Sequence, residues 1–407
     1  MLEMRKMKDS GIEWIGEIPE GWSIARGKHI LTLLQRAVFP TDGVITCFRD
    51  GEVTLRSNRR EDGFTVSLKE IGYQGIEPGD LVVHGMDGFA GSIGISDSRG
   101  KSSPVLVVLD SSQDKKYLMY YLRSMAYNNV FLALSTGIRV RSCDLKWNKL
   151  ADLLYLVPPI VEQHKLVSFL DEKCSEIDAM LSKTRASIEE YKKLKQAVIT
   201  QAVATQQCSH IKLKYLMNVI VDCPHETPTY SFTGNYYVIR TADQALASLR
   251  RDEDMYRLDA SEYKKRTRRL TLDKDDIVYG REGSWGLACL VPQSNKYCLG
   301  QRVMQFRCNT RLLYPKYAMY ALNSETVYMQ GALDTIGSTA PHVNISTICN
   351  YLLPVPALNE QKEITNYLDA KCAEIDKLIA KKEQLAKELE SYKKSLIYEV
   401  VTGKREV

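Results

Sequence analysis

A long internal repeat is the feature that most constrains the fold of this chain. The segment EQHKLVSFLDEKCSEID, residues 162–178, returns as EQKEITNYLDAKCAEID, residues 360–376, 198 positions later and without a gap. Nine of the 17 positions are identical, and they include charged, apolar and cysteine positions. The period is far longer than the ~20–50 residues of solenoid repeats. The repeat therefore indicates a duplicated unit made of a domain and a helix.

Each copy of the repeat begins a long predicted helix. Prolines precede both starts, in LVPPIVEQ and LPVPALNEQ, and proline followed by an acidic residue is typical of a helix N-terminus. Apolar or small residues then recur at three- and four-residue spacing. In the first helix they are Cys174, Ile177, Leu181, Thr184, Ile188, Tyr191, Val198 and Ala202, with Lys195 interrupting, and in the second Ile375, Leu378, Leu385, Leu389, Tyr392 and Leu396.

So narrow a stripe over several heptads favours a coiled coil in which each helix is the partner of the other. A helix of about 40 residues, rising 1.5 Å per residue, would be roughly 60 Å long. The alternative is a pair of ordinary core helices in a compact fold. It is less favoured because both helices are polar outside the stripe and far longer than a typical globular helix.

Two segments of similar length accompany the helices, and each has a mixed pattern of strands and short helices. Echoes of the duplication persist in EPGDLVV (77–83) and DKDDIVY (273–279), and in STGIRVR and GSTAPHVN before the two helices. Elsewhere the segments differ almost completely. We therefore predict an α+β fold with two unlike globular domains on two alike helices. The predicted boundaries are 1–157 and 210–352 for the globular domains, and 158–209 and 353–407 for the central and distal helical regions.

Composition limits the class of protein without naming it. The 407 residues are enough for two or three domains, and a net charge of +5 is too small to argue for nucleic acid by itself. No apolar run reaches the ~18 residues of a membrane span, and no apolar segment follows the first charges as in a signal peptide. The ten cysteines include no CxxC pair, which predicts reduced thiols in a cytoplasmic protein and lowers the expectation of a zinc site.

Two sequence motifs typical of enzymes occur in incomplete form, and neither meets the requirements of its active site. An adenine methyltransferase needs Asn or Asp before Pro-Pro-aromatic, whereas Pro158 and Pro159 stand between Val157 and Ile160. The segment GISDSRGKS, 94–102, is one residue too long for a phosphate-binding loop, and the strand-like SPVLVVLD follows it where that loop needs a helix. A stand-alone DNA-modifying enzyme and an adaptor that binds only protein remain the alternatives to a DNA-binding scaffold.

Clusters of cations support DNA binding better than the total charge does. KKRTRR, 264–269, has five cations in six residues, and smaller groups occur at 56–60 and 139–141. We expect phosphate contacts there, although a charge run is most often a solvated loop. Arg281 stands between glycines in GREGSWG and could bind guanine, or equally form a salt bridge with Glu282 or another carboxylate. Tyr279 and Trp285 are more typical of a core, and Cys174 and Cys372 of small buried groups.

Taken in order, the motifs resemble one family, the specificity subunits (HsdS) of type I restriction-modification systems. The opening KDSGIEWIGEIPEGW, the segment GIRVRSCDLKWNKL before LVPPIVEQ, and PVPALNEQ with IDKLIAKKEQL resemble its start and its two conserved helical regions. DCPHETP, RRLTLDKDDIVYGREGSWGLACLV, CLGQRVMQF and GSTAPHVNIS together resemble one class of its target recognition domains.

The resemblance implies a subunit without catalytic activity. Each globular domain would read one half of a bipartite, asymmetric site in double-stranded DNA, and the helices would form an antiparallel coiled coil with pseudo-two-fold symmetry that sets the spacing. Modification subunits, expected in two copies, would methylate adenine with S-adenosylmethionine, and restriction subunits would use ATP and Mg²⁺. No cofactor or metal is expected on this chain, and the system would serve anti-phage defence.

Residue roles follow from the same resemblance. Candidates for DNA contact are Arg56, Arg59, Arg60, Arg139, Arg141, His225, Thr227, Lys264, Lys265, Arg266, Arg268, Arg269, Arg281 and His342. Candidates for subunit docking and the spacer are Glu162, Gln163, Asp171, Ile177, Glu360, Gln361, Asp369 and Ile375.

The segment DCPHETP, 222–228, combines four residue types that occur in active sites. Cys223 and His225 would point the same way on an extended chain, which leaves a nucleophile possible. No equivalent occurs in the first globular domain, and zinc would need further ligands that no nearby Cys or His pair supplies. We favour a rigid loop that opens the second domain and exposes His225, Glu226 and Thr227 to DNA, with catalysis or metal binding as the minor alternative.

Overall fold

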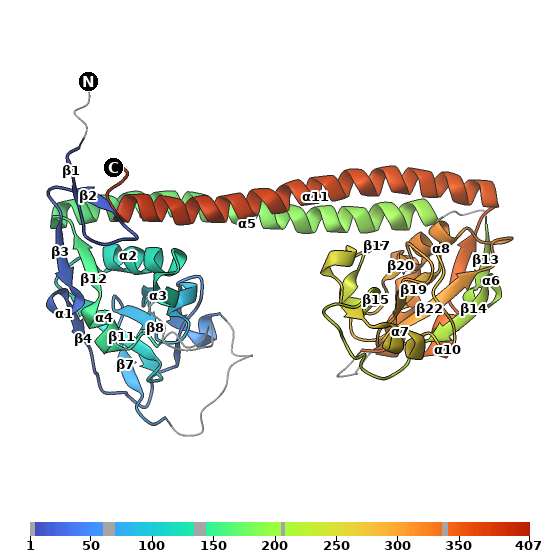
Figure 1. The fold of residues 1–407 in the computed structure, drawn as a ribbon, viewed down its shortest axis with the longest axis horizontal. Coiled ribbons are helices and arrows are strands. Elements are labelled where there is room, and N and C mark those ends of the chain that lie inside the picture. Colours follow the sequence, from blue (N-terminus) through green and yellow to red (C-terminus); the bar gives the residue numbers. More distant parts are fainter. Residues whose placement is uncertain (1–4, 60–69, 134–143, 205–207, 336–340) are drawn as a thin grey trace. The chain divides into compact units, whose positions relative to one another are not determined.

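The computed structural model of the 407-residue chain describes residues 5–59, 70–133, 144–204, 208–335 and 341–407. The chain divides into two compact units. Unit 1 comprises residues 1–183 and 385–407, and unit 2 comprises residues 184–384. Helices α5 (Ile160–Val203) and α11 (Leu358–Val401) each belong in part to both units (Figure 1). No helix in the described part of the chain is long and apolar enough to cross a membrane.

Unit 1 is built around an antiparallel sheet of order β4-β11-β8-β9. Its strands are β4 (Leu31–Leu33), β11 (Leu106–Ser111), β8 (Leu81–His84) and β9 (Ile93–Ile95). Helix α2 (Lys115–Tyr127) follows β11 and buries most of its residues in the core. The remaining pairs are β1 (Met7–Asp9) with β2 (Glu17–Pro19), β3 (Ser23–Arg26) with β12 (Leu154–Val157), β5 (Ile45–Cys47) with β6 (Val53–Leu55), and β7 (Gln74–Ile76) with β10 (Gly100–Ser102). Short helices are α1 (Gly27–Ile30), α3 (Val130–Ala133), α4 (Trp147–Asp152), and the 3₁₀ turns η1 (Arg56–Asn58) and η2 (Gly88–Ala90).

Unit 2 contains an antiparallel sheet of the same form, of order β14-β22-β19-β20. Its strands are β14 (Met217–Asp222), β22 (Val303–Cys308), β19 (Ile277–Gly280) and β20 (Ala288–Leu290), and α8 (Pro315–Leu322) follows β22. A second sheet joins β18 (Arg257–Leu258), β15 (Tyr236–Ile239) and β21 (Tyr297–Leu299), and smaller pairs join β13 (Ser209–Lys212) with β23 (Leu352–Val355) and β16 (Gln244–Ala245) with β17 (Ser248–Leu249). The other helices are α6 (Leu213–Leu216), α7 (Ala260–Arg266), α9 (Glu325–Ala332), α10 (Ile345–Cys349), η4 (Thr241–Asp243), η5 (Asp252–Asp254) and η6 (Leu333–Thr335).

The two sheets share a buried aspartate where the sequence showed its weak echo. Asp80 accepts a hydrogen bond from the backbone N–H of Glu77 and pairs with Arg36. Asp276 accepts the N–H of Asp273 at 2.8 Å and pairs with Arg307. Both carboxylates are almost fully buried. Each therefore closes the turn that enters the central strand, and an arginine compensates the buried charge.

Helices α5 and α11 run without interruption because neither contains proline or glycine. Within unit 1, Leu170, Cys174, Ile177 and Leu181 of α5 share a core with Leu396, Ile397, Val400 and Val401 of α11. Within unit 2, Ile199 and Val203 of α5 share a core with Leu368 and Cys372 of α11. In each unit the early part of one helix thus packs with the late part of the other. Cys174 and Cys372 are buried in these cores, as expected for small apolar groups.

The predicted stripe of the second helix is wrong at two positions. Leu385 and Tyr392 are exposed, whereas Ala386 is buried and Lys393 is half-buried. Lys393 occupies the inward position because its Nζ pairs with both carboxylate oxygens of Asp178 at 2.7 Å. The face of α11 that contacts α5 therefore includes a lysine, and a prediction from apolar residues alone placed this face one residue too early in the sequence.

Candidate functional site

One edge of the β14-β22-β19-β20 sheet gathers the residues that carry possible chemistry. The strands alternate in direction, so the ends of β14 and β19 meet the start of β22, with Asp222 opposite Met304 and Gly280 opposite Val303. Asp222 is the last residue of β14, Arg281 follows β19, and Arg302 precedes β22. Three separate sequence motifs therefore converge on this edge, which we call the unit 2 edge.

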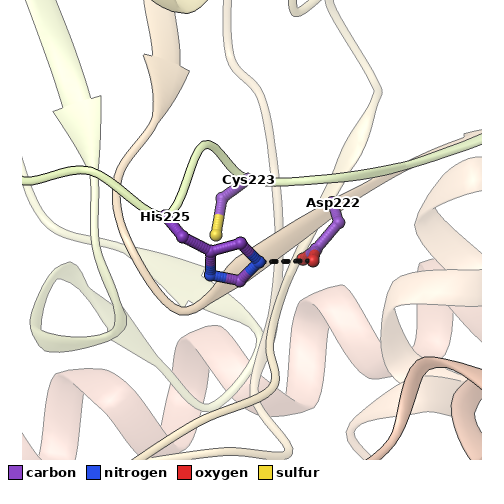
Figure 2. A group of neighbouring side chains, drawn as sticks. All are labelled: Asp222, Cys223 and His225. Carbon is purple, nitrogen blue, oxygen red and sulfur yellow. Dashed lines mark hydrogen bonds and ion pairs between the residues drawn. The ribbon is translucent and has the colours of Figure 1, made fainter.

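Asp222 is the acceptor around which the unit 2 edge is organised. Its Oδ2 lies 3.0 Å from Nε2 of His225, and its Oδ1 accepts from Nε of Arg281 at 3.1 Å. Arg281 also donates to Glu282, with 2.7 Å between Nη2 and Oε1. Figure 2 shows the Cys223 sulfur beside the His225 ring, with the ring joined to Asp222. The short segment therefore brings its Asp, Cys and His together, as the sequence allowed.

The same geometry argues against a nucleophile or a metal ion at this group. The possible ligand atoms of Asp222, Cys223 and His225 all lie within 4.8 Å of one another. However, Cys223 is 1% exposed, and burial raises the pKa of its thiol despite hydrogen bonds from the backbone of Val303 and Arg302. A metal ligand or nucleophile must be a thiolate, which this environment disfavours. The Arg281 guanidinium already holds the Asp222 carboxylate and would repel a cation.

Arg281 is 8% exposed, and its charge is compensated on two sides by Asp222 and Glu282. Of the two alternatives for this residue, the salt bridge is the one observed. Its backbone is also fixed: the N–H of Val343 donates to its carbonyl at 3.0 Å, and the residue after it, Glu282, forms an antiparallel bridge with His342. The exposed His342 is therefore brought to the unit 2 edge by pairing with the 281–283 segment.

The basic cluster 264–269 divides into exposed and buried members. Helix α7 ends at Arg266, and Lys264, Lys265, Arg268 and Arg269 are exposed. Arg266 is 6% exposed, and it donates to the carbonyls of Leu299 at 3.0 Å and Glu226 at 3.1 Å. The predicted DNA contact is wrong for Arg266, because its hydrogen bonds fasten α7 to the loop after Cys223. Thr227, in that loop, is exposed.

The cations predicted to contact DNA in unit 1 are less available than the sequence suggested. Arg59 lies between Asp50, 2.6 Å away, and Glu52, 3.0 Å away, and its guanidinium covers the ring of Phe48. Arg56 donates from Nε to the hydroxyl of Thr46 at 3.2 Å. Arg60, Arg139 and Arg141 lie outside the described residues.

The repeated residues of the helical regions have mostly internal partners. Gln163 and Gln361 are fully buried, so neither side chain is available to dock a partner. The Gln163 amide accepts from the N–H of Asp114 at 3.0 Å and donates to the Pro158 carbonyl at 2.8 Å. The Gln361 amide accepts from the N–H of Tyr314 at 2.7 Å and donates to the Pro356 carbonyl at 2.8 Å. Each glutamine therefore clamps the start of its helix to the globular part of its own unit.

Asp171 and Asp369 form a second repeated contact. Asp171 accepts from the Tyr120 hydroxyl at 2.8 Å and pairs with Lys116 at 2.6 Å. Asp369 makes the same pair of contacts with Tyr320, at 2.9 Å, and Lys316, at 2.6 Å. Ile177 and Ile375 are buried, Glu162 pairs with Arg5 at 2.5 Å, and Glu360 is exposed. Of these repeated acidic residues, Glu360 therefore keeps the freest surface for docking.

The sequence analysis missed the partners of Asp171 and Asp369, although a signal was present. KKYLMYYL, 115–122, and PKYAMYAL, 315–322, share Lys, Tyr, Met, Tyr and Leu at matching positions, 200 residues apart. The difference from the 198-residue spacing of the helices hides this second repeat from a search at one offset.

Residues 223–390 match the sequence model of the type I restriction modification DNA specificity domain. This chain is thus similar to the specificity subunits of type I restriction-modification systems. Its similarity to one such subunit, that of the EcoBI enzyme of Escherichia coli, is 26% identity over 130 residues, which covers 32% of this chain and 27% of that protein. Similarity to the putative MjaX specificity subunit of Methanocaldococcus jannaschii is lower, at 21%, but extends over 99% of this chain and 98% of that protein.

The fold is also that of a solved chain from a type I R-M system. A chain from a structural study of complex assembly and conformational transition of the type I R-M system aligns with a TM-score of 0.70 and 15% identity. The alignment covers 95% of this chain and 99% of that one. The mixed helix and strand content predicted from the sequence is thus shared with this solved chain.

Proposed function

We propose that this chain is the DNA-reading subunit of a type I restriction-modification complex, in which each globular part reads one half of a bipartite site. The reading is asymmetric because the two globular parts differ where they would touch DNA. The edge of unit 2 is built on Asp222, Arg281 and Arg302. At the corresponding turn of unit 1, after β8, His84 instead accepts the backbone N–H of Asp87 at 3.0 Å.

Helices α5 and α11 would act as an antiparallel coiled coil that sets the spacing between the two half-sites. The observation that carries this proposal is a repeated interhelical ion pair. Lys195 pairs with Asp376 in unit 2, and Lys393 pairs with Asp178 in unit 1, with 198 positions between equivalent residues. Such reciprocal contacts are the mark of two-fold symmetry, here between two halves of one chain.

The chemistry would lie in partner proteins. Two modification subunits would methylate adenine with S-adenosylmethionine, and restriction subunits would supply ATP- and Mg²⁺-dependent cleavage. The described residues of the unit 2 edge support this division, because burial raises the pKa of the Cys223 thiol and Arg281 pairs with the Asp222 carboxylate. Exposed Glu360 and the exposed outer faces of α5 and α11 would be available for docking those partners.

The test is to map methylated adenines in cells that express this chain with its modification subunit. We expect a bipartite, non-palindromic motif that disappears when the gene for this chain is deleted. Replacing residues 210–352 by the same segment of a related subunit should change one half of the motif and leave the other half and the spacing intact. Methylation that persists without the chain would contradict the proposal, as would a swap that changes both halves or neither.

A further inference from the structure

Arg302 has a backbone conformation that an arginine rarely adopts. Its φ is +70°, and only four other described non-glycine residues have positive φ: Asn129, Ala247, Asp275 and Asn295. Asn and Asp tolerate this region, whereas for most other side chains it costs about 1–2 kcal/mol. Strain of this kind persists where the surroundings fix the chain, and it is concentrated at functional sites.

The surroundings of Arg302 do fix its backbone. Its carbonyl accepts the N–H of Arg281 at 2.9 Å, and its own N–H hydrogen-bonds to the Cys223 sulfur. Two residues earlier, the N–H of Gly300 donates to the carbonyl of Ile239 at 2.8 Å. The strained residue is thus attached to three neighbouring segments of unit 2.

The side chain of Arg302 is left available by the same arrangement. It is exposed, and among the described residues no hydrogen bond or ion pair engages its guanidinium. Its Nη1 lies 3.6 Å from the position that a Cβ on Gly283 would occupy. Gly283 itself has φ +69°. The glycine therefore leaves open the surface along which the arginine extends.

The two arginines of the unit 2 edge thus have opposite environments. Arg281 is buried and neutralised by Asp222 and Glu282, so it cannot turn toward a ligand without giving up both of these ion pairs. Arg302 lies directly beside it, on a backbone that Arg281 helps to hold, with its charge uncompensated by any described residue. His225 and His342 are exposed at the same edge.

We propose that Arg302 is a specificity-determining residue of unit 2, whose guanidinium donates to O6 and N7 of one guanine in the major groove, with Arg281 as its positioning residue. The inference rests on the proposed function and names the contact at one of its two reading surfaces. A phosphate contact needs no fixed backbone, since a flexible cation on any surface can make it. A bidentate contact with a base edge needs a guanidinium held in one place, and this is what the strained, hydrogen-bonded backbone provides.

The experiment is selection from a random double-stranded DNA library by the full chain copurified with its modification subunit. Wild type, Arg302→Ala, Arg302→Gly and Arg302→Lys are compared, with Arg268→Ala as a matched control for an exposed cation outside the edge. We expect Arg302→Ala to relax one guanine position in one half-site, with discrimination at that position falling by roughly 5- to 150-fold. The other half-site should be unchanged, and Arg302→Lys should not restore the full preference because lysine lacks the planar fork.

Arg302→Gly separates the contact from the fold. Glycine adopts positive φ without strain, so this variant should melt at or above the wild-type temperature and still lose the guanine preference. If the Arg302 variants select the same motif as the wild type, the role of Arg302 is overturned and the proposed function still stands. Uniformly weaker binding of all sequences, as expected for Arg268→Ala, also overturns that role, because it indicates a phosphate contact. A wild-type complex that selects no motif overturns the proposed function, and the inference with it.

Discussion

Lys195 and Asp376 form an ion pair between α5 and α11, with Nζ 2.8 Å from both carboxylate oxygens. The lysine side chain is 8% exposed and the aspartate side chain 51% exposed. Without its partner the lysine would therefore be a buried, poorly solvated charge, whereas the aspartate would be solvated by water. Lys195 is the residue that interrupts the apolar stripe of α5, and its equivalent Lys393 makes the same contact with Asp178. The interruption is therefore part of the repeated helix contact.

Removing the aspartate should destabilise unit 2 more than removing the lysine. Asp376→Ala leaves a buried ammonium without its partner, at a cost of about 2–3 kcal/mol, which for a unit of this size lowers Tm by roughly 4–12 °C. Lys195→Met removes the buried charge and leaves an aspartate that water can solvate, so the change should stay within about 1 kcal/mol. Differential scanning calorimetry of both variants measures the difference.

The pair in unit 1 is the matched control for this asymmetry. Lys393 is more exposed than Lys195, at 20%, so Asp178→Ala should cost less than Asp376→Ala. Equal destabilisation by Asp376→Ala and Lys195→Met would mean that burial of the lysine does not determine the strength of this contact.

The helices could be predicted from the sequence because they depend on local pattern. Proline before each start, the absence of proline and glycine within them, and apolar residues at three- and four-residue spacing predicted that both helices exist. Their contact faces were harder to predict, because Lys393 lies inward only by virtue of a carboxylate on the other helix. No local pattern contains the position of that partner.

The candidate site was predicted in its segments but not in the roles of its residues. Arg266 and Arg302 look equally available in the sequence, yet one is buried against the carbonyls of Leu299 and Glu226 and the other is exposed. The difference depends on tertiary packing and on a positive φ, and neither leaves a signature in composition. The sequence left contact between Cys223 and His225 open, and the structure adds Asp222 to the group, within hydrogen-bond distance of the His225 ring.

The buried glutamine that clamps α11 to unit 2 should be intolerant of change. Gln361→Ala leaves the N–H of Tyr314 and the carbonyls of Leu312 and Pro356 without a partner, which should destabilise unit 2 by about 2–4 kcal/mol. Gln361→Glu keeps the shape but sets a carboxylate against two carbonyls. Its folded-state pKa would be raised, so the lost stability should return as the pH falls toward about 4.

Gln163→Ala is the equivalent test in unit 1. Calorimetry should show that it lowers the melting temperature of unit 1 and leaves that of unit 2 unchanged. If Gln361→Ala lowered both transitions equally, the glutamine would be acting on the chain as a whole, contrary to a clamp local to unit 2. Urea titrations followed by tryptophan fluorescence at pH 7 and pH 5 would measure the recovery in Gln361→Glu.

The exposed cations of the α7 region should control the salt dependence of DNA binding. Changing Lys264, Lys265, Arg268 and Arg269 to glutamine should weaken binding to all sequences and lower the slope of log K against log salt by up to about 3–4. The control removes four exposed lysines of α11, Lys362, Lys377, Lys381 and Lys387, for the same change in net charge. Fluorescence anisotropy over a salt series measures DNA binding by both variants. If the two sets of substitutions had equal effects, the α7 cations would act only through the net charge of the chain and not through contacts with DNA.

The buried thiols should make the fold sensitive to alkaline pH. Burial raises the pKa of Cys47 in unit 1 and of Cys289, Cys298 and Cys308 in unit 2 to about 12. In the unfolded chain a thiol ionises near pH 8.5, so above that value the unfolded state releases protons that the folded state retains, and stability is lost as the pH rises toward 12. Each buried thiol should lower the free energy of unfolding by about 1–2 kcal/mol at pH 10.

Cys289→Ala should therefore flatten the decline of stability between pH 8 and pH 10, as measured by urea unfolding. The cavity that this substitution leaves lowers stability equally at all pH values, so the slope against pH is the quantity to compare. A decline that is as steep in Cys289→Ala as in the wild type would show that the buried thiol titrates in the folded protein as it does in the unfolded chain.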